Sequence, residues 1–180
     1  MKHIKRWGLM KNTEQENIKE HSFDVAVTAH ALALIANKFY GKNYDVSRVT
    51  LLALYHETSE VITGDLATPI KYYNPQIKES YKKIEHIANE KLLSMLPKEL
   101  TEEYRAVMIN EQDEYYPIVK AADKITAYIK CITELNSGNR EFLSASKNLL
   151  SDINSYSLPE VKYYMENCMP SFSLSLDELN

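Results

Sequence analysis

Two histidines and two carboxylates in three separate segments of the chain have the composition of a metal-binding site. His56 and Glu57 stand side by side near the end of an apolar stretch, with His21 upstream and Asp123 downstream. Mixed imidazole and carboxylate ligands suit a borderline divalent ion such as Mn, Fe, Co, Ni or Zn. Asp123 interrupts an apolar helical pattern, and a carboxylate is costly to bury unless it is paired or binds a metal. These four residues could therefore enclose one divalent ion; the alternative is that they are unrelated surface or capping residues.

A protease-type zinc motif is an alternative for the central segment. In His-Glu-x-x-His, two histidines on one helix bind zinc and the glutamate is the base. Here Glu60 stands where the second histidine would be, so the motif is incomplete. His30 lies nine residues after His21, which places it on the opposite side of a helix that turns by about 100° per residue. We expect His30, His3 and His86 to be ordinary core or surface residues.

Helices must position these groups, because the chain reads as one helical segment after another. A capping box of Thr13 and Glu16 is expected to begin the first helix, and Gly41 to end it. Gly64 is expected to close the second helix with a loop. With 4 glycines, 6 prolines and no convincing strand pair, the predicted fold class is all-α. The expected helices cover 13–40, 46–62, 74–96, 99–110, 117–137, 140–154 and 159–167.

Composition indicates one soluble domain over residues 1–180 that does not bind nucleic acid. Hydrophobic residues make up 44% and charged residues 26% of the chain, which is ordinary for a globular protein. The net charge of −4 provides no basic surface for nucleic acid. No apolar run is long enough to cross a membrane. Cys131 and Cys168 have no metal-binding spacing, which favours a reducing, cytoplasmic environment. The tail from Pro170 is expected to be extended.

Short motifs that recur in order along nearly the whole chain carry a family resemblance. They are Arg6-Trp7-x-Leu9-Met10, Glu20-His21-Ser22, Leu52-Ala-Leu-Tyr55-His56, Ser59-Glu60-Val61, Thr63-Gly64-Asp65-Leu66, Lys120-x-Ala122-Asp123 and Pro170-Ser-Phe-x-Leu-Ser-Leu-Asp-Glu. In this order they resemble the YfbR-like 5′-deoxynucleotidases of the HD-domain superfamily. The chain departs from the family at one ligand, because Glu57 follows His56 where the family has an aspartate.

The resemblance implies an HD-domain bundle of about six or seven helices and a metal-dependent phosphatase. The substrate would be a deoxyribonucleoside 5′-monophosphate, from which the enzyme removes the phosphate. His21, His56 and Asp123 would bind the metal, with Glu57 in the fourth position. The cofactor would be one divalent transition metal (Co, Mn, Zn, Fe, Ni or Cu), and the protein would form a homodimer.

The resemblance also implies roles for residues around the metal. Arg6 would bind the phosphate, and its planar guanidinium suits that group. Trp7 would pack against the sugar and leave no room for a ribose 2′-hydroxyl. Glu60 would orient or deprotonate the attacking water, and Asp65 would line the substrate site. Each residue also has a purely structural alternative: a solvated base, a core anchor, a helix-face carboxylate and a turn residue, respectively.

Glu57 leaves three outcomes open. Its side chain is one methylene longer than that of Asp, or about 1.5 Å, whereas metal sites tolerate ligand shifts of about 0.2 Å. The site could adjust and keep the metal, change its metal preference, or bind metal weakly. We favour the first outcome because Arg6, Trp7, Glu60 and Asp65 are all in place.

Two other functions remain open. A deoxynucleoside triphosphate hydrolase on the same scaffold would need extra basic groups, for which Lys71, Lys120 and Lys124 are the candidates. A non-catalytic nucleotide-binding protein would follow if Glu57 disabled the metal site.

Overall fold

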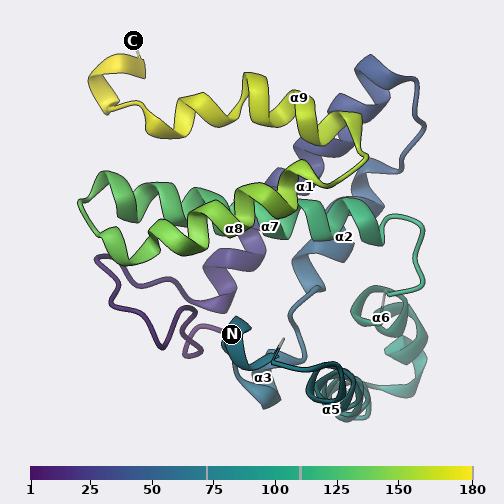
Figure 1. Cartoon of the computed structure of the whole chain (residues 1–180). Coiled ribbons are helices and arrows are strands. Elements are labelled where there is room, and N and C mark those ends of the chain that lie inside the picture. The colour runs from purple at the N-terminus through teal and green to yellow at the C-terminus, as the bar shows by residue number, and fades with distance from the viewer. Residues whose placement is uncertain (72, 110, 180) are drawn as a thin grey trace.

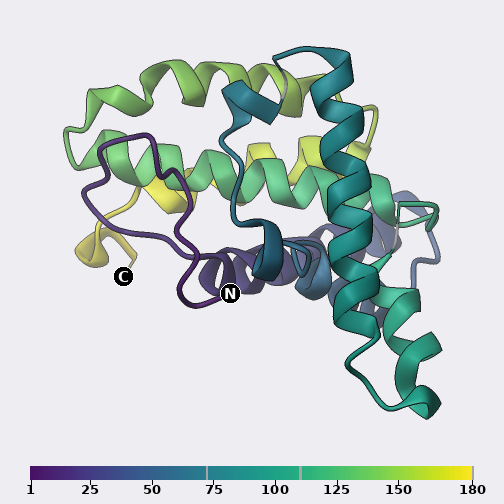
Figure 2. The same cartoon turned by 90° about the horizontal axis from the view of Figure 1, so that it is seen from below.

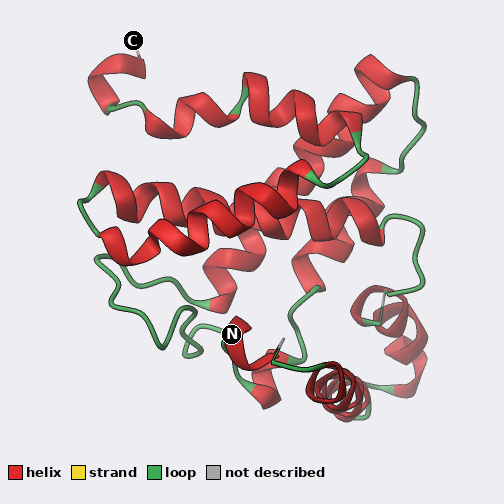
Figure 3. Ribbon diagram, in the orientation of Figure 1, coloured by secondary structure: helices red, strands yellow, loops and turns green. Residues whose placement is uncertain are grey.

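The computed structural model describes residues 1–71, 73–109 and 111–179 and confirms the all-α class (Figure 1). Figure 3 shows helices joined by loops, and the described residues form no strand. Their β-type pairing is one isolated antiparallel bridge between Lys5 and Asn17. The α-helices are α1 (Ile18–Tyr40), α2 (Val46–Tyr55), α3 (Glu60–Thr63), α4 (Thr68–Lys71), α5 (Pro75–Leu93), α6 (Thr101–Met108), α7 (Tyr116–Asn136), α8 (Leu143–Asn154) and α9 (Pro159–Asn167). Short 3-10 helices cover Lys98–Leu100, Arg140–Phe142, Met169–Ser173 and Leu176–Leu179.

Helices α1 and α7 form the centre of the fold. Helix α1 packs against α2, α7 and α9, while α8 runs back along α7 (Figure 1). Helix α5, seen end-on in Figure 1 and along its length in Figure 2, lies to one side with α6. Val25, Leu32, Leu52, Ile125 and Ile153 are almost completely buried where these helices meet. Each such side chain contributes about 1.5–3 kcal/mol to stability, so the core holds α1, α2 and α7 firmly. No helix in the described ranges is both long enough and apolar enough to span a membrane.

The first helix begins later than predicted. Asn17 is its N-cap and forms the capping box with Glu20, so the prediction of a box at Thr13 and Glu16 is wrong. The Asn17 side chain accepts hydrogen bonds from the backbone of Lys19 and Glu20, and the Glu20 carboxylate accepts one from the Asn17 N–H. Gly41 ends the helix in the left-handed region at φ 64°, as predicted.

The second predicted helix is interrupted at the candidate site. It ends at Tyr55, and a turn leads to α3, so the prediction of one helix over 46–62 is wrong, and His56 and Glu60 do not lie on one continuous helix. The imidazole Nδ1 of His56 lies 2.6 Å from the carbonyl oxygen of Ala53, and the Thr58 hydroxyl donates to the carbonyl of Tyr55 at 2.6 Å. The same two carbonyls also accept from the backbone N–H groups of His56 and Thr58, three residues on, so the α-helical pattern gives way to tighter turns.

The remaining boundaries agree to within a few residues. The helix predicted over 74–96 ends at Leu93, and the helix predicted over 99–110 splits into a 3-10 turn and α6, with residue 110 outside the described part. Helices α7, α8 and α9 match their predictions closely. The prediction of an extended tail is wrong, because residues 169–173 and 176–179 form 3-10 turns. Pro170 favours a helical first turn, and the Glu178 carboxylate accepts from the hydroxyl and N–H of Ser175.

Candidate metal centre

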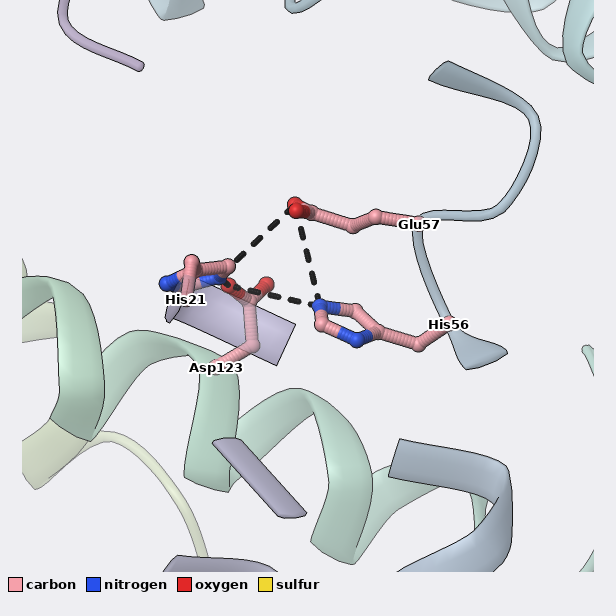
Figure 4. A group of neighbouring side chains, drawn as sticks. All are labelled: His21, His56, Glu57 and Asp123. Atoms are coloured by element: carbon pink, nitrogen blue, oxygen red, sulfur yellow. Dashed lines mark hydrogen bonds and ion pairs between the residues drawn. The ribbon is translucent and has the colours of Figure 1, made fainter. Parts of the chain in front are cut away.

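The structure brings the four predicted metal ligands together. His21 comes from the first turn of α1, His56 and Glu57 from the turn after α2, and Asp123 from the middle of α7; their side chains point at one another (Figure 4). One ligand atom of each lies within 4.8 Å of those of the others. Sequence segments about a hundred positions apart therefore supply one cluster, because the apolar core packs α1, α2 and α7 together.

Both imidazoles present Nε2 to the cluster. The His56 Nδ1 is placed to donate to the Ala53 carbonyl, and burial lowers the pKa of His56, so its Nε2 carries a lone pair. The His21 Nδ1 lies 3.4 Å from Glu16 Oε1, an ion-pair contact without the alignment of a hydrogen bond. Metal-binding histidines characteristically engage the second ring nitrogen, which sets the orientation of the ring; His56 does so by a hydrogen bond and His21 by the contact with Glu16.

The spacing of the donor atoms fits one metal ion. Glu57 Oε1 lies 3.8 Å from His21 Nε2 and 3.7 Å from His56 Nε2, and Asp123 Oδ1 lies 3.1 and 3.9 Å from the same nitrogens. Two ligands about 2.1 Å from one ion at a tetrahedral angle are roughly 3.4 Å apart. His56 Nε2 and Glu57 Oε2 are buried and have no hydrogen-bond partner in the described part of the chain. Unpaired buried polar atoms are rare, and a metal would satisfy them.

The charges at the cluster also favour a cation. Burial opposes a charge on the His21 ring, but the carboxylates of Glu57 and Asp123 help to raise its pKa to about 9. Burial likewise opposes an ionised Asp123, yet Lys120, whose ammonium lies 2.6 Å from Asp123 Oδ2, and the histidines hold the pKa of this carboxyl well below its usual range. A buried site that stabilises positive charge beside ionised carboxylates suits a divalent ion.

The N-terminal strap, residues 1–17, places Arg6 and Trp7 against the cluster. The Arg6 N–H donates to the Glu16 carbonyl at 3.0 Å, and its Nη1 donates to Glu57 Oε1 at 2.9 Å. The Trp7 indole N–H donates to Glu16 Oε2 at 2.9 Å, and the ring centroid lies 5.2 Å from that of Phe142. Two of the three predicted substrate residues, Arg6 and Trp7, therefore contact the predicted ligands, directly for Arg6 and through Glu16 for Trp7.

Glu60 and Asp65 complete the surroundings of the cluster. Glu60 begins α3 and is 6% exposed; burial, then the charges of Glu57 and Asp65, raise its pKa to about 9. A carboxyl with this pKa keeps its proton at neutral pH and suits donation to an oxygen, unless positive charge is brought near. Asp65 lies on the loop after Gly64, where its carboxylate accepts a hydrogen bond from the Trp7 backbone.

A pocket of about 730 Å³ opens beside the cluster, within the range of small-ligand sites. His56, Glu57, Glu60 and Lys120 are among its lining residues, and α5 contributes many of the others. One side of the cluster is therefore reachable by a small molecule.

Comparison with known proteins identifies the family. The family model described as 5′-deoxynucleotidase YfbR-like matches residues 1–172. The chain belongs to the YfbR-like 5′-deoxynucleotidase family. A 5′-deoxynucleotidase of Vibrio vulnificus (strain YJ016) is 52% identical over 182 residues, covering 100% of this chain and 94% of the relative. One from Yersinia pseudotuberculosis (serotype I, strain IP32953) is 49% identical over 186 residues, covering 100% and 92%.

Solved structures agree with the HD-domain fold of this 5′-deoxynucleotidase family member. An HD-domain phosphohydrolase from Listeria innocua has a TM-score of 0.83 at 22% identity, covering 94% of this chain and 82% of that one. An HD phosphohydrolase of cyanophage S-2L, bound to dA and one catalytic Zn²⁺ ion, has a TM-score of 0.64 at 21% identity, covering 94% and 92%. The predicted fold class and family are both confirmed.

Two carboxylates of this 5′-deoxynucleotidase received no functional role from the sequence. Glu16, predicted as part of a capping box, instead contacts Trp7 within the strap and His21 on α1. Glu134 is fully buried near the end of α7 and accepts from the N–H and the hydroxyl of Thr13, at 2.9 and 2.6 Å. The sequence does contain a pattern that indicates burial of Glu134, because Glu134 continues the helical spacing of the buried residues Ala127 and Cys131.

Proposed function

We propose that this protein removes the 5′-phosphate of deoxyribonucleoside monophosphates, using one divalent transition metal held by His21, His56, Glu57 and Asp123. The convergence of four donor atoms in one partly buried cluster, with Arg6 beside it, carries the proposal. A divalent ion held there would acidify water and stabilise the charge that develops on the phosphoryl oxygens. The relatives named 5′-deoxynucleotidase support the same substrate class.

The protein's own groups would position the substrate. Arg6 would offer its planar guanidinium to the phosphate, the geometry in which arginine binds oxyanions well. The indole of Trp7, fastened by Glu16, would occupy the space beside the sugar. Glu60 would orient the attacking water, and Asp65 would hold the Trp7 backbone while lining the site.

The candidate lysines favour a monophosphate over a triphosphate. Lys71 pairs with Glu85 at 2.8 Å, Lys120 with Asp123 at 2.6 Å, and Lys124 with Asp152 at 2.7 Å. A carboxylate partner already neutralises each cation that would be needed for two further phosphates. Product analysis separates the two substrates, since a triphosphate hydrolase releases tripolyphosphate and a monophosphatase releases phosphate.

The first test measures phosphate release from deoxyribonucleotides and the matching ribonucleotides, with cobalt or manganese and with a chelator. We expect chelator-sensitive activity that is restricted to deoxy substrates. Trp7→Ala is expected to reduce the deoxy-to-ribo ratio of kcat/KM by up to about a hundredfold, the discrimination that steric exclusion of one hydroxyl can provide. Phe172→Ala, which removes an exposed aromatic ring, should leave the ratio unchanged. A wild type that hydrolyses both sugars equally would contradict the role of Trp7.

Metal analysis tests whether Glu57 serves as a ligand. Because Glu57 Oε1 reaches within 3.8 Å of both imidazole Nε2 atoms, the purified protein should hold one divalent transition metal per chain, measured by elemental analysis. Glu57→Gln should bind that metal at least about tenfold more weakly, since it removes a charged ligand. Glu166→Gln, on the exposed surface of α9, is the matched control. A metal-free wild type beside a metal-loaded Glu57→Asp variant would overturn this assignment and favour the non-catalytic alternative.

We also propose that the protein forms a homodimer in the cytoplasm. Large apolar side chains are exposed along one stretch of α1, at Phe23, Val27 and Leu34, and such surfaces commonly mark association. Cys131 and Cys168 are free thiols, as is usual in a reducing compartment. The mass in solution, measured by sedimentation, tests the dimer.

A further inference from the structure

One carboxylate, Glu16, contacts three groups that the proposed function uses. Its Oε2 accepts from the Trp7 indole N–H at 2.9 Å and lies 3.4 Å from Arg6 Nε, while its Oε1 lies 3.4 Å from His21 Nδ1. The side chain is only 11% exposed, so water competes weakly for these contacts. Glu16 is therefore the point at which the strap is joined to the metal cluster.

We propose that Glu16 is a positioning residue that sets both the preference for deoxyribose and the affinity for the metal. It would do so by holding the Trp7 indole at the sugar position and the His21 ring toward the ion. The inference rests on the proposed function, which assigns Trp7 to the sugar and His21 to the metal.

The backbone of Trp7 shows why the indole needs this contact. Trp7 adopts φ 58°, the left-handed region that bulky residues rarely enter. Such a conformation persists only when several contacts hold it. Here Phe142 packs against the ring, Asp65 accepts from the backbone N–H, and Glu16 accepts from the indole N–H. Of these contacts, the one to Glu16 fixes the direction of the indole edge.

The contact to His21 connects the same carboxylate to the metal. With its Nδ1 facing Glu16, the His21 ring presents Nε2 to Asp123 and Glu57. Outer carboxylates of this type commonly change metal affinity about 10–100-fold when they are removed. His56 uses the backbone carbonyl of Ala53 for the same purpose, so Glu16 is the side chain through which this effect can be tested.

Glu16→Gln tests the proposal with little change in shape. A glutamine has one acceptor oxygen and no charge, so it cannot both accept from the indole N–H and place a carboxylate oxygen beside the His21 Nδ1. We expect the affinity for Co²⁺ alone, measured by titration, to fall about 10–100-fold. At saturating Co²⁺, the deoxy-to-ribo ratio of kcat/KM should fall about tenfold. Trp7 is the single tryptophan. Its indole should become more exposed in Glu16→Gln, so acrylamide should quench the fluorescence more strongly than in the wild type.

Two further variants separate positioning from loosening of the strap. Glu14→Gln changes an exposed side chain two residues away and should behave as the wild type in all three measurements. Glu134→Gln weakens the anchor of Thr13 without touching Glu16, and should lower thermal stability while leaving Co²⁺ affinity within about threefold of wild type.

The outcomes distinguish this proposal from the proposed function. Wild-type Co²⁺ affinity and sugar ratio in Glu16→Gln would overturn the role of Glu16, and so would an equal loss of Co²⁺ affinity in Glu134→Gln. A wild type without any turnover would instead refute the proposed function. The Co²⁺ titration and the Trp7 fluorescence of Glu16→Gln would then still decide whether Glu16 positions both groups.

Discussion

Asp123→Asn is expected to lose the metal and to reduce kcat by about a thousandfold or more. Its Oδ1 lies 3.1 Å from His21 Nε2 and 3.9 Å from His56 Nε2, which places Asp123 at the centre of the cluster. The amide removes the negative charge that the ion would neutralise. A metal contributes several kcal/mol to stabilising charge at a phosphoryl group, and about 4 kcal/mol corresponds to a thousandfold in rate.

The experiment compares metal content, kcat and thermal unfolding for the wild type and two variants. Asp152→Asn is the matched control, because Asp152 also pairs with a lysine, Lys124 at 2.7 Å, but lies on α8 away from the cluster. It should keep the metal and the rate. Asp123→Asn also deprives Lys120 of its partner, so its helical circular dichroism must show that it still folds. A folded Asp123→Asn protein with full metal and full activity would refute the assignment of this ligand.

Helical periodicity was sufficient to predict the all-α class and most helix boundaries, because the apolar stripes of α1 and α7 are long and regular. It was insufficient where two local solutions compete. Thr13 with Glu16 and Asn17 with Glu20 both have the spacing of a capping box. The choice between them depends on Glu134, which lies 121 positions from Thr13. The Thr13 N–H and hydroxyl both donate to this carboxylate, so they do not take part in a capping box with Glu16.

At the candidate site too, the sequence indicated the ligand residues but not the contacts that depend on the fold. Residue types and order were enough to group His21, His56, Glu57 and Asp123, because their imidazoles and carboxylates are metal-ligand types and Asp123 interrupts an apolar helix. The break after Tyr55 was not predictable from helix propensity, since it is stabilised by side chains that bond to carbonyls of the preceding turn. The role of Glu16 was hidden for another reason: it depends on the fold of the strap, which local pattern does not encode.

Arg6→Ala is expected to separate phosphate binding from metal binding. Removing one well-placed donor to a reacting oxyanion costs about 10²–10³-fold in rate, so kcat/KM for deoxyribonucleotides should fall by that factor. Metal affinity should remain or increase. Arg6 Nη1 lies 2.9 Å from Glu57 Oε1, the same oxygen that faces both imidazoles. Without the Arg6 guanidinium, the Glu57 carboxylate is more available to a metal ion, and the positive charge that repels this ion is removed.

Inhibition by inorganic phosphate and titration with Co²⁺ measure the two effects of Arg6→Ala independently. Arg140→Ala, which removes an exposed arginine at the start of a 3-10 turn, should change neither. Arg6→Lys keeps the charge but loses the planar fork, so it should restore only part of the phosphate affinity. If Arg6→Ala lost Co²⁺ and phosphate affinity together, Arg6 would be a structural support of Glu57 rather than a phosphate ligand. Opposite changes in the two affinities would show that Glu57 is shared between Arg6 and the metal, a competition made possible by the longer reach of glutamate at this position.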